Sequence, residues 1–326
     1  MKVIDMHCDT IYEINRLRYE DQDIGLRDND LNISLKKMQK GDYLLQNFAM
    51  FTPLKEVDDP ICHVQHMIDT FYQELDKNKD LIQIVYCYDD IIKNTRHHKM
   101  SALLTLEEGA VVHDDLAYLR NYYRLGVRMI TLNWNYINGI GYPNFQMNDE
   151  SHGFHCFDDQ HGLTEFGIAY VKECERLGII IDVSHLSDAG FYDVLKYTSQ
   201  PFVASHSNAR AICDHARNLS DDMIKELAKR GGVMGINFAS DFLNEKADMS
   251  YVSDMVKHIM HIREIAGIDC IGLGTDFDGI PQNLELKDAS YMSLLYDALK
   301  ESGFSEEEIE KIFYKNVLRV YQTVLK

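Results

Sequence analysis

Short apolar runs alternate with amphipathic helical patterns along most of the chain. Eight of these runs have the length of a β-strand, and we predict that each forms one. They cover residues 3–9, 43–51, 101–107, 127–133, 178–184, 202–206, 232–238 and 270–276. The pattern between residues 15 and 40 is less regular, and it predicts no definite element there.

Helical periodicity fills most of the gaps between the predicted strands. The expected helices lie around residues 62–77, 115–125, 164–177, 187–197, 221–229 and 251–266, and two more follow Ser290. Three of them open with a serine ahead of acidic residues, in "SDAG" at Ser187, "SDDM" at Ser220 and "SEEE" at Ser305. A hydroxyl at this position is typical of a helix N-cap.

Strands that alternate with helices predict a parallel sheet, and eight repeats favour an α/β fold of the (β/α)₈ TIM-barrel type. An open doubly wound sheet is the alternative, but the glycine-rich nucleotide motifs typical of such sheets are missing. No Pro/Gly-rich linker divides the chain, so we expect one catalytic domain over residues 1–326. The long connection at about 134–162 is expected to be a lid-like loop over the active site.

Composition restricts the partners and the compartment. The formal net charge of −19 argues against nucleic acid and anionic membrane surfaces as partners. No stretch has the pattern of a signal peptide or the length of a membrane span. The seven cysteines are scattered and odd in number, which indicates reduced thiols and a cytoplasmic protein.

Residues typical of metal ligands recur where the predicted strands end. Active-site groups of a barrel lie at the C-terminal ends of its strands. The side chains in question are His7, Asp9, Glu107, Glu108, His185, His206, Asp276 and Asp278. A single histidine at a strand end usually serves packing, but five strand ends that meet at one barrel mouth predict a metal site.

The two-residue period of a strand helps to select among these residues. It places His7 and Asp9 on one face and Cys8 on the other, where we expect Cys8 to pack. In the last strand it turns Gly272, Gly274 and Asp276 toward the barrel axis. For Glu107 and Glu108 the period leaves the choice open, because leucines precede them on both faces.

Mixed imidazole and carboxylate ligands favour Zn²⁺, with Mn²⁺, Co²⁺ or Fe²⁺ as alternatives. Six ligands exceed one tetrahedral zinc, so we expect two divalent ions that share a glutamate. One ion would take His7, Asp9 and Asp276, and the other would take His185 and His206. Three carboxylates and a hydroxide would balance the charge of the two ions, and such a pair promotes hydrolysis by hydroxide near neutral pH.

The motifs "DMHCDT", "EEGA", "IDVSHLS", "SHSNARAICDHARN" and "GLGTDFDG", in this order, resemble those of the membrane (renal-type) dipeptidase family, peptidase M19. The resemblance covers nearly the whole chain and implies a (β/α)₈ barrel with two zinc ions. It implies that Glu108, directly before Gly109, is the bridging ligand. It further implies that Asp276 shuttles a proton and that Arg217 pairs with the substrate's C-terminal carboxylate.

The chain departs from the family pattern at two positions near the substrate. Trp134, in "TLNWN", stands where the animal enzymes have a substrate-binding histidine, and Asn133 or Asn135 is a candidate replacement donor. Phe242 stands where they place a tyrosine. The histidines of "HGFHCFDDQH", namely His152, His155 and His161, allow a second metal site, but we favour a lid.

The metal-site pattern predicts a hydrolase, and the resemblance implies a zinc-dependent dipeptidase that cleaves dipeptides with a free C-terminal carboxylate through a metal-bridging hydroxide. Another binuclear amidohydrolase-like enzyme, with lactam, lactone or deaminase chemistry, is the alternative. Such enzymes commonly begin with H-x-H and often bridge with a carbamylated lysine, whereas this chain has H-x-D. A metal-binding protein without catalysis is a further alternative. The resemblance is also compatible with a homodimer, which no sequence feature tests.

Overall fold

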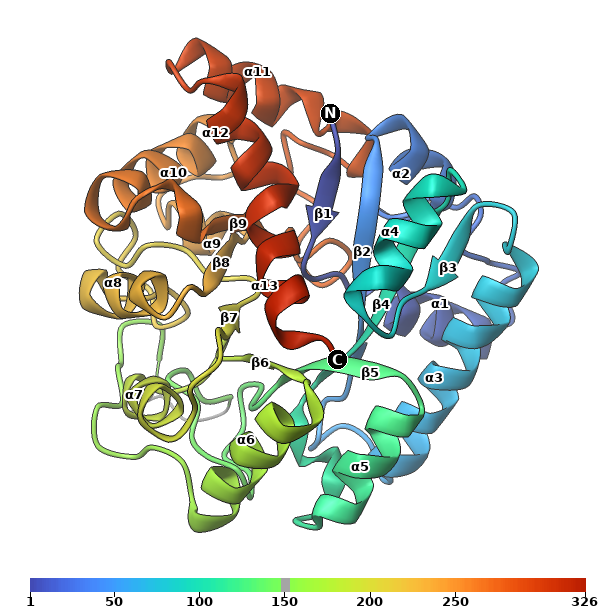
Figure 1. Ribbon diagram of the computed structural model, residues 1–326, viewed down its shortest axis with the longest axis vertical. Coiled ribbons are helices and arrows are strands. Elements are labelled where there is room, and N and C mark those ends of the chain that lie inside the picture. Colours follow the sequence, from blue (N-terminus) through green and yellow to red (C-terminus); the bar gives the residue numbers. More distant parts are fainter. Residues whose placement is uncertain (148–152) are drawn as a thin grey trace.

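Eight parallel strands close into a ring in the computed structural model, which describes residues 1–147 and 153–326 (Figure 1). Around the ring, each strand pairs with the next, and β9 pairs with β1. The ring consists of β1 (Val3–Asp5), β2 (Tyr43–Phe51), β4 (Met100–Glu107), β5 (Val127–Thr131), β6 (Ile180–Asp182), β7 (Val203–Ala204), β8 (Val233–Ile236) and β9 (Ile271–Leu273). The predicted (β/α)₈ barrel is therefore confirmed.

Helices connect the strands, and most of them surround the ring on the outside (Figure 1). They are α1 (Thr10–Tyr19), α2 (Leu35–Lys40), α3 (Pro60–Lys77), α4 (Tyr88–Arg96), α5 (Leu116–Arg124), α6 (Glu165–Leu177), α7 (Asp188–Tyr197), α8 (Asp221–Lys229), α9 (Ser240–Leu243), α10 (Val252–Ala266), α11 (Ser293–Glu301), α12 (Glu306–Glu310) and α13 (Asn316–Val324). Short helical turns lie at Gly109–Val112, Ile268–Cys270, Ala289–Tyr291 and Lys311–Lys315. The three predicted N-caps are confirmed, because Ser187, Ser220 and Ser305 each accept a hydrogen bond from a first-turn backbone N–H.

One helix closes the end of the barrel where the strands begin. Helix α13 crosses the centre of the ring in Figure 1, and its Val317, Val320 and Tyr321 pack against side chains that fill the barrel, such as Met6. The Tyr321 hydroxyl donates a 2.8 Å hydrogen bond to Asn47 Oδ1 inside the barrel. A ligand therefore has to enter the barrel from the opposite end, where the strands finish.

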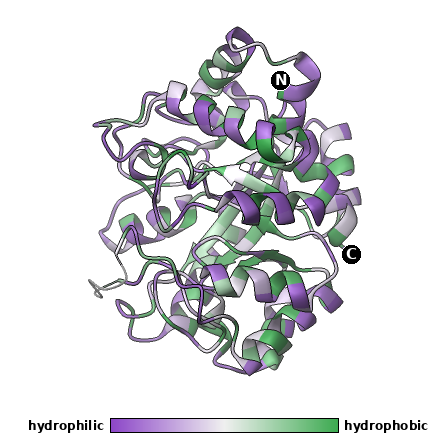
Figure 2. Ribbon diagram, turned by 90° about the vertical axis from the view of Figure 1, so that its left-hand side faces the viewer, coloured by the Kyte–Doolittle hydropathy of each residue, from purple (hydrophilic) through white to green (hydrophobic). Residues whose placement is uncertain are grey.

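The apolar residues form two layers, as the strand period requires. Leu103 belongs to the cluster inside the barrel, whereas Leu104 and Leu106 belong to the cluster between the strands and the outer helices. Figure 2 shows the central strands as largely hydrophobic, with the long loops on one side of the barrel and the C-terminus on the other. In the described part of the chain, no helix is both long and apolar enough to cross a bilayer.

Several elements differ from the sequence prediction. Strand β3 (Ile82–Ile84) was not predicted, and it pairs with the start of β4 outside the ring. A run of three residues is too short to give a recognisable alternation. The helices α1, α2 and α4 were not predicted either. Most strands are shorter than expected, so that the site residues lie on the loops that follow them.

Candidate active site

Six buried side chains from five strand ends meet at the open end of the barrel. They are His7 and Asp9 after β1, Glu107 at the end of β4, His185 after β6, His206 after β7 and Asp276 after β9. Each is less than a tenth exposed. All six are among the metal-ligand candidates of the sequence, and all but Glu107 belong to the ligand set expected for the two ions, in which the resemblance implied Glu108 as the bridge.

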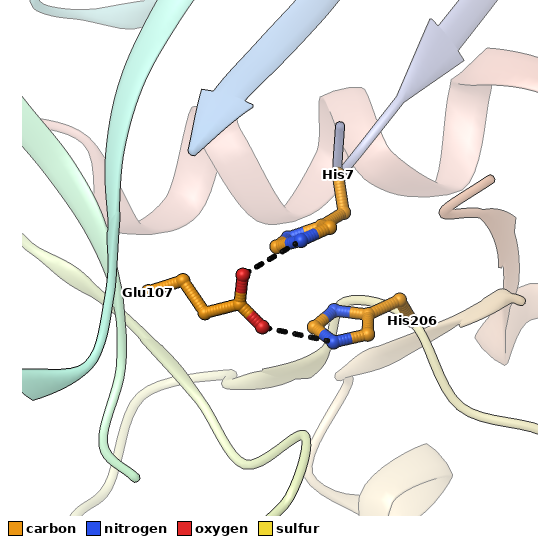
Figure 3. A group of neighbouring side chains, drawn as sticks. All are labelled: His7, Glu107 and His206. Carbon is orange, nitrogen blue, oxygen red and sulfur yellow. Dashed lines mark ion pairs between the residues drawn. The ribbon is translucent and has the colours of Figure 1, made fainter. Parts of the chain in front are cut away.

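Glu107 lies at the centre of this group. Its Oε2 is 3.2 Å from His7 Nε2, and its Oε1 is 3.2 Å from His185 Nε2 and 3.6 Å from His206 Nε2. Figure 3 shows the carboxylate between the rings of His7 and His206, with a different oxygen directed to each. A carboxylate in this position can bridge two cations.

His7 is shared between two groups of potential ligands. The first consists of His7, Asp9 and Asp276, and the second of His7, Glu107 and His206, with all ligand atoms of a group within 4.8 Å of one another. His7 Nε2 lies 3.6 Å from Asp9 Oδ2 and 3.8 Å from Asp276 Oδ1. The first group is the ligand set that we expect for one of the two ions.

Glu108 does not belong to this cluster, which corrects the expectation that it bridges the ions. Its Oε1 accepts hydrogen bonds from the backbone N–H of Ala110 and from Asn138 Nδ2, and its Oε2 accepts one from the N–H of Trp134. Its side chain therefore anchors the loop after β5. Burial raises the pKa of Glu108 to about 7.

The strand period explains why Glu107 takes the central position. Leu103 and Glu107 are four residues apart on β4 and thus share a face, and Leu103 packs inside the barrel. Leu104 and Leu106 face the helices, as Glu108 would if the strand continued. Instead the chain turns at Glu108, which has a φ of 109°. The sequence could not resolve this choice, because leucines precede the two glutamates on both faces of the strand.

Left-handed backbone conformations also occur at two members of the cluster. His185 has a φ of 72° and Asp276 a φ of 62°. Non-glycine residues adopt such conformations at a cost, and they concentrate at functional sites. The space next to the cluster is also restricted at Gly279, because a Cβ there would lie 2.0 Å from Asp9 Oδ2.

Hydrogen bonds fix the tautomers of two histidines. His206 Nδ1 is 2.7 Å from Ser205 Oγ, whose hydroxyl hydrogen is donated to Asp182 Oδ2 at 2.5 Å. Ser205 therefore accepts the Nδ1–H of His206. His185 Nδ1 likewise donates to Asn135 Oδ1 at 2.7 Å. Both rings thus carry a lone pair on Nε2.

These two lone pairs converge. The Nε2 atoms of His185 and His206 lie 3.0 Å apart, close to Glu107 Oε1. Burial, followed by the charge of Arg217, lowers the pKa of His185 to about 4, and burial also holds the pKa of His206 well below its usual value. Two neutral rings that face each other in this way have no proton to share, and a cation satisfies both.

His7 and Asp9 also have buried polar atoms without a hydrogen-bond partner in the described part of the chain. Neither ring nitrogen of His7 has a hydrogen-bond partner among the described residues. Burial lowers the pKa of His7, but the carboxylates of Glu107 and Asp9 outweigh burial and hold it well above its usual value. Burial and the charge of Glu107 raise the pKa of both Asp9 and Asp276. Such a crowded, buried set of carboxylates and imidazoles fits divalent cations.

A pocket of ≈ 460 Å³ opens above the cluster. Asp9, Glu107, His185 and Asp276 form part of its wall. A larger, more open groove of ≈ 780 Å³ lies beside Glu74, where Arg18 and Lys77 already neutralise that carboxylate. The pocket above the cluster is the candidate substrate site.

Of the residues expected near the substrate after β5, Trp134 and Asn135 line this pocket and Asn133 does not. Trp134 packs its ring against Phe51 and lies 6.2 Å from the ring of His185, measured between centroids. Asn135 orients His185 through its Oδ1, as described above. Asn133 lies outside the pocket wall and donates to backbone carbonyls of its own loop, so it is not the replacement donor.

Arg217 is almost fully buried in the pocket wall, at 4% exposure. Its Nη2 donates to the carbonyl oxygen of His206 at 3.1 Å, and its guanidinium lies 5.4 Å from the ring centre of Phe242. Its Nε has no partner among the described residues. Arg217 is therefore placed to bind an anionic group next to the metal-ligand cluster.

The long loop between β5 and α6 contributes Phe145, Met147 and Phe154 to the pocket wall, in addition to Trp134 and Asn135. Of its three histidines, His152 lies outside the described residues. His155 is paired with Asp214 and Glu245, and His161 with Asp158. His155 and His161 thus have different partners, rather than a common centre.

The fold and the site define a (β/α)₈ hydrolase with a metal centre at the barrel mouth. The chain belongs to the membrane dipeptidase family (peptidase family M19), whose model matches residues 1–326. It is a metallo-dipeptidase.

Individual proteins are similar to this chain over most of its length. An uncharacterized dipeptidase of Schizosaccharomyces pombe is 33% identical, over 98% of this chain and 80% of its own length. The solved structure of dipeptidase AC, a metallopeptidase of the same family, superposes with a TM-score of 0.89 and 25% identity, over 100% of this chain and 99% of that chain. A metallopeptidase of Rhodobacter sphaeroides, liganded with a phosphinate mimic of the dipeptide L-Ala-D-Ala, superposes with a TM-score of 0.88 and 24% identity, over 99% of both chains.

Proposed function

We propose that this protein is a dipeptidase that uses two Zn²⁺ ions and hydrolyses dipeptides with a free C-terminal carboxylate. The observation that carries the proposal is the position of Glu107, whose two oxygens face different histidines in a pocket that also contains Arg217. One ion would be held by His7, Asp9 and Asp276 and the other by His185 and His206, with Glu107 between them. When bound, two such ions supply a hydroxide nucleophile and polarise the amide carbonyl.

The protein's own groups would position and protonate the substrate. We assign to Asp276 the role of taking the proton from the attacking water and returning it to the leaving amine nitrogen. Asn237 Nδ2 donates to Asp276 Oδ2 at 2.8 Å and so fixes the carboxylate in place. Arg217 would bind the terminal carboxylate of the substrate, since a guanidinium forms two parallel hydrogen bonds with this group.

This arrangement determines which bond of the substrate is cleaved. Arg217 lines the same pocket as Asp9, Glu107, His185 and Asp276, and we propose that a carboxylate held by Arg217 lies one residue beyond the bond that is cleaved. A tripeptide held in the same way would place its C-terminal peptide bond over the cluster as well, so its exclusion depends on the space that the ≈ 460 Å³ pocket leaves for the extra N-terminal residue. The phosphinate bound to the Rhodobacter sphaeroides relative mimics L-Ala-D-Ala, so dipeptides with a C-terminal D-residue belong among the candidate substrates.

A panel of dipeptides tests this proposal. The protein is reconstituted with Zn²⁺, Mn²⁺ or Co²⁺ and assayed on L-L and L-D dipeptides, the matching tripeptides, and dipeptides with an amidated C-terminus. We expect turnover of free dipeptides alone, and its loss when a chelator removes the metals. A lactone, β-lactam or nucleobase turned over instead would contradict the proposal, as would the absence of any hydrolysis.

We also propose a cytoplasmic location. All seven cysteines have free thiols, which fits a reducing compartment. The proposed partner of the site is a small dipeptide. That the protein forms a homodimer, and that it binds neither nucleic acid nor a membrane, remain predictions. Fractionation of cells followed by immunodetection tests the location, and light scattering of the purified protein measures the assembly.

A further inference from the structure

His215 is a buried histidine in the pocket wall that none of the steps above uses. It lies in the segment between β7 and α8 and is 3% exposed. Its ring lies between two aromatic rings, with centroid distances of 4.6 Å to Phe242 and 5.0 Å to Phe154. All three side chains line the pocket above the metal-ligand cluster.

The backbone around His215 determines which of its nitrogens carries the hydrogen. The backbone N–H of Arg217 donates to His215 Nδ1 at 3.1 Å. A backbone N–H can only donate, so Nδ1 accepts and the hydrogen of the neutral ring lies on Nε2. Burial, followed by the charge of Arg217, lowers the pKa of His215 to about 3, and the ring stays neutral at physiological pH.

The Nε2–H of His215 has no acceptor among the described residues, although the atom is buried. The Nε of Arg217 is a second buried donor without a partner. Both side chains contact the same ring, that of Phe242, which offers no hydrogen-bonding group of its own. Buried donors without partners are rare in folded proteins, and two of them on one pocket wall indicate a ligand that supplies acceptors.

We propose that His215 is a substrate-binding residue, which donates its Nε2–H to the terminal carboxylate of the dipeptide beside the guanidinium of Arg217. A carboxylate is the ligand group that fits best, because it carries several acceptor positions and the negative charge that Arg217 requires. This inference rests on the proposed dipeptidase function and adds a second group that selects for the free carboxylate.

Two variants separate hydrogen bonding from packing. His215→Leu fills a similar volume but removes the donor. His215→Gln is the matched control, because its side-chain amide keeps an N–H near the position of Nε2. Neither variant retains the acceptor for the N–H of Arg217, so the two share that loss. Melting temperature and metal content establish that both variants fold and load metal.

Binding of two probes to the zinc-loaded proteins then provides the test, measured by calorimetry. The probes are the phosphinate mimic of L-Ala-D-Ala and the same compound with its carboxylate converted to a primary amide. For His215→Leu, we expect the acid to bind about 10- to 100-fold more weakly and the amide less than about threefold more weakly. His215→Gln should recover at least half of the lost binding energy. In turnover of the best dipeptide, KM should rise in His215→Leu, while kcat changes less than about threefold.

Equal losses for acid and amide, or an unchanged KM in His215→Leu, would overturn the role of His215. These results leave the dipeptidase proposal intact, because they presuppose that the wild-type protein hydrolyses dipeptides. A wild-type protein that hydrolyses none of them overturns the proposed function and this inference together.

Discussion

The carboxylates of Glu107 and Glu108 are adjacent in sequence but contact different parts of the molecule. Glu107 lies 3.2 Å from the Nε2 atoms of both His7 and His185, whereas Glu108 accepts hydrogen bonds from Ala110, Trp134 and Asn138. One glutamate therefore belongs to the metal-ligand cluster, and the other fixes the loop that carries Trp134 and Asn135.

Replacing each glutamate by glutamine distinguishes these roles. We expect Glu107→Gln to lose at least one equivalent of metal and nearly all activity, because an uncharged amide is a poor bridge between two cations. Glu108→Gln should keep both equivalents and a measurable kcat. Its cost is a fall of about 1–3 kcal/mol in the free energy of unfolding, since the amide –NH₂ cannot accept one of the three hydrogen bonds.

Elemental analysis of the purified variants and urea unfolding provide these measurements. Metal loss in Glu108→Gln together with full loading in Glu107→Gln would reverse the assignment made from the structure.

Asp276→Asn tests the proton shuttle. Asparagine keeps the shape of the side chain but cannot accept the proton, so we expect kcat to fall by about 10²- to 10⁴-fold. Binding of the phosphinate dipeptide mimic should remain measurable, since Arg217 and His215 are unchanged. Near-normal turnover in this variant would exclude Asp276 as the proton carrier.

Ser205→Ala tests whether the tautomer of His206 supports metal binding. The variant removes the acceptor for the Nδ1–H of His206 and leaves Asp182 without one of its donors. Loss of such an orienting contact typically costs 10- to 100-fold in metal affinity, and we expect a value of about that size here. Ser184→Ala is the matched control, because Ser184 contacts the backbone N–H of His206 rather than its ring. Competition with a chromogenic chelator measures the affinities, and equal losses in both variants would contradict a specific role for Ser205.

Much of the fold could be predicted because the barrel strands are continuous apolar runs with no competing pattern. The three-residue strand β3 lacked such a signal, and its pairing outside the ring is decided by tertiary contacts. The convergence of strand ends followed from the barrel itself, so His185, His206 and Asp276 could be selected before their geometry was known.

The finer details of the site depended on where each strand ends. The expected face shared by His7 and Asp9 assumed a strand through residue 9, but β1 ends at Asp5. Beyond it, hydrogen bonds hold the chain, since Asp5 accepts from the N–H and hydroxyl of Thr275, and the N–H of Asp9 donates to the carbonyl of Phe277. These contacts join residues about 270 positions apart, which no local pattern encodes. His215 was missed because its signal is an unpaired nitrogen, which only the structure reveals.

The last prediction concerns stability against pH and the buried His258 of α10. The N–H of Ala209 donates to its Nδ1 at 3.1 Å, and its Nε2–H donates to the carbonyl oxygen of Leu243 at 2.9 Å. A protonated ring would lose the first of these hydrogen bonds. Burial lowers the pKa of His258 to about 4, from a value of about 6.5 in the unfolded chain.

Between pH 6.5 and 4 the unfolded chain therefore binds a proton at this position that the folded protein does not, so stability falls as the pH falls. The loss attributable to His258 reaches about 2.5 kcal/mol at pH 4.5. His258→Gln removes the titration, and we expect its free energy of unfolding to fall less than that of the wild type between pH 7 and pH 4.5. Urea unfolding at both values measures the difference. The histidines of the metal site occur in both proteins, so their contributions cancel. Equal changes in the two proteins would show that His258 does not couple folding to pH.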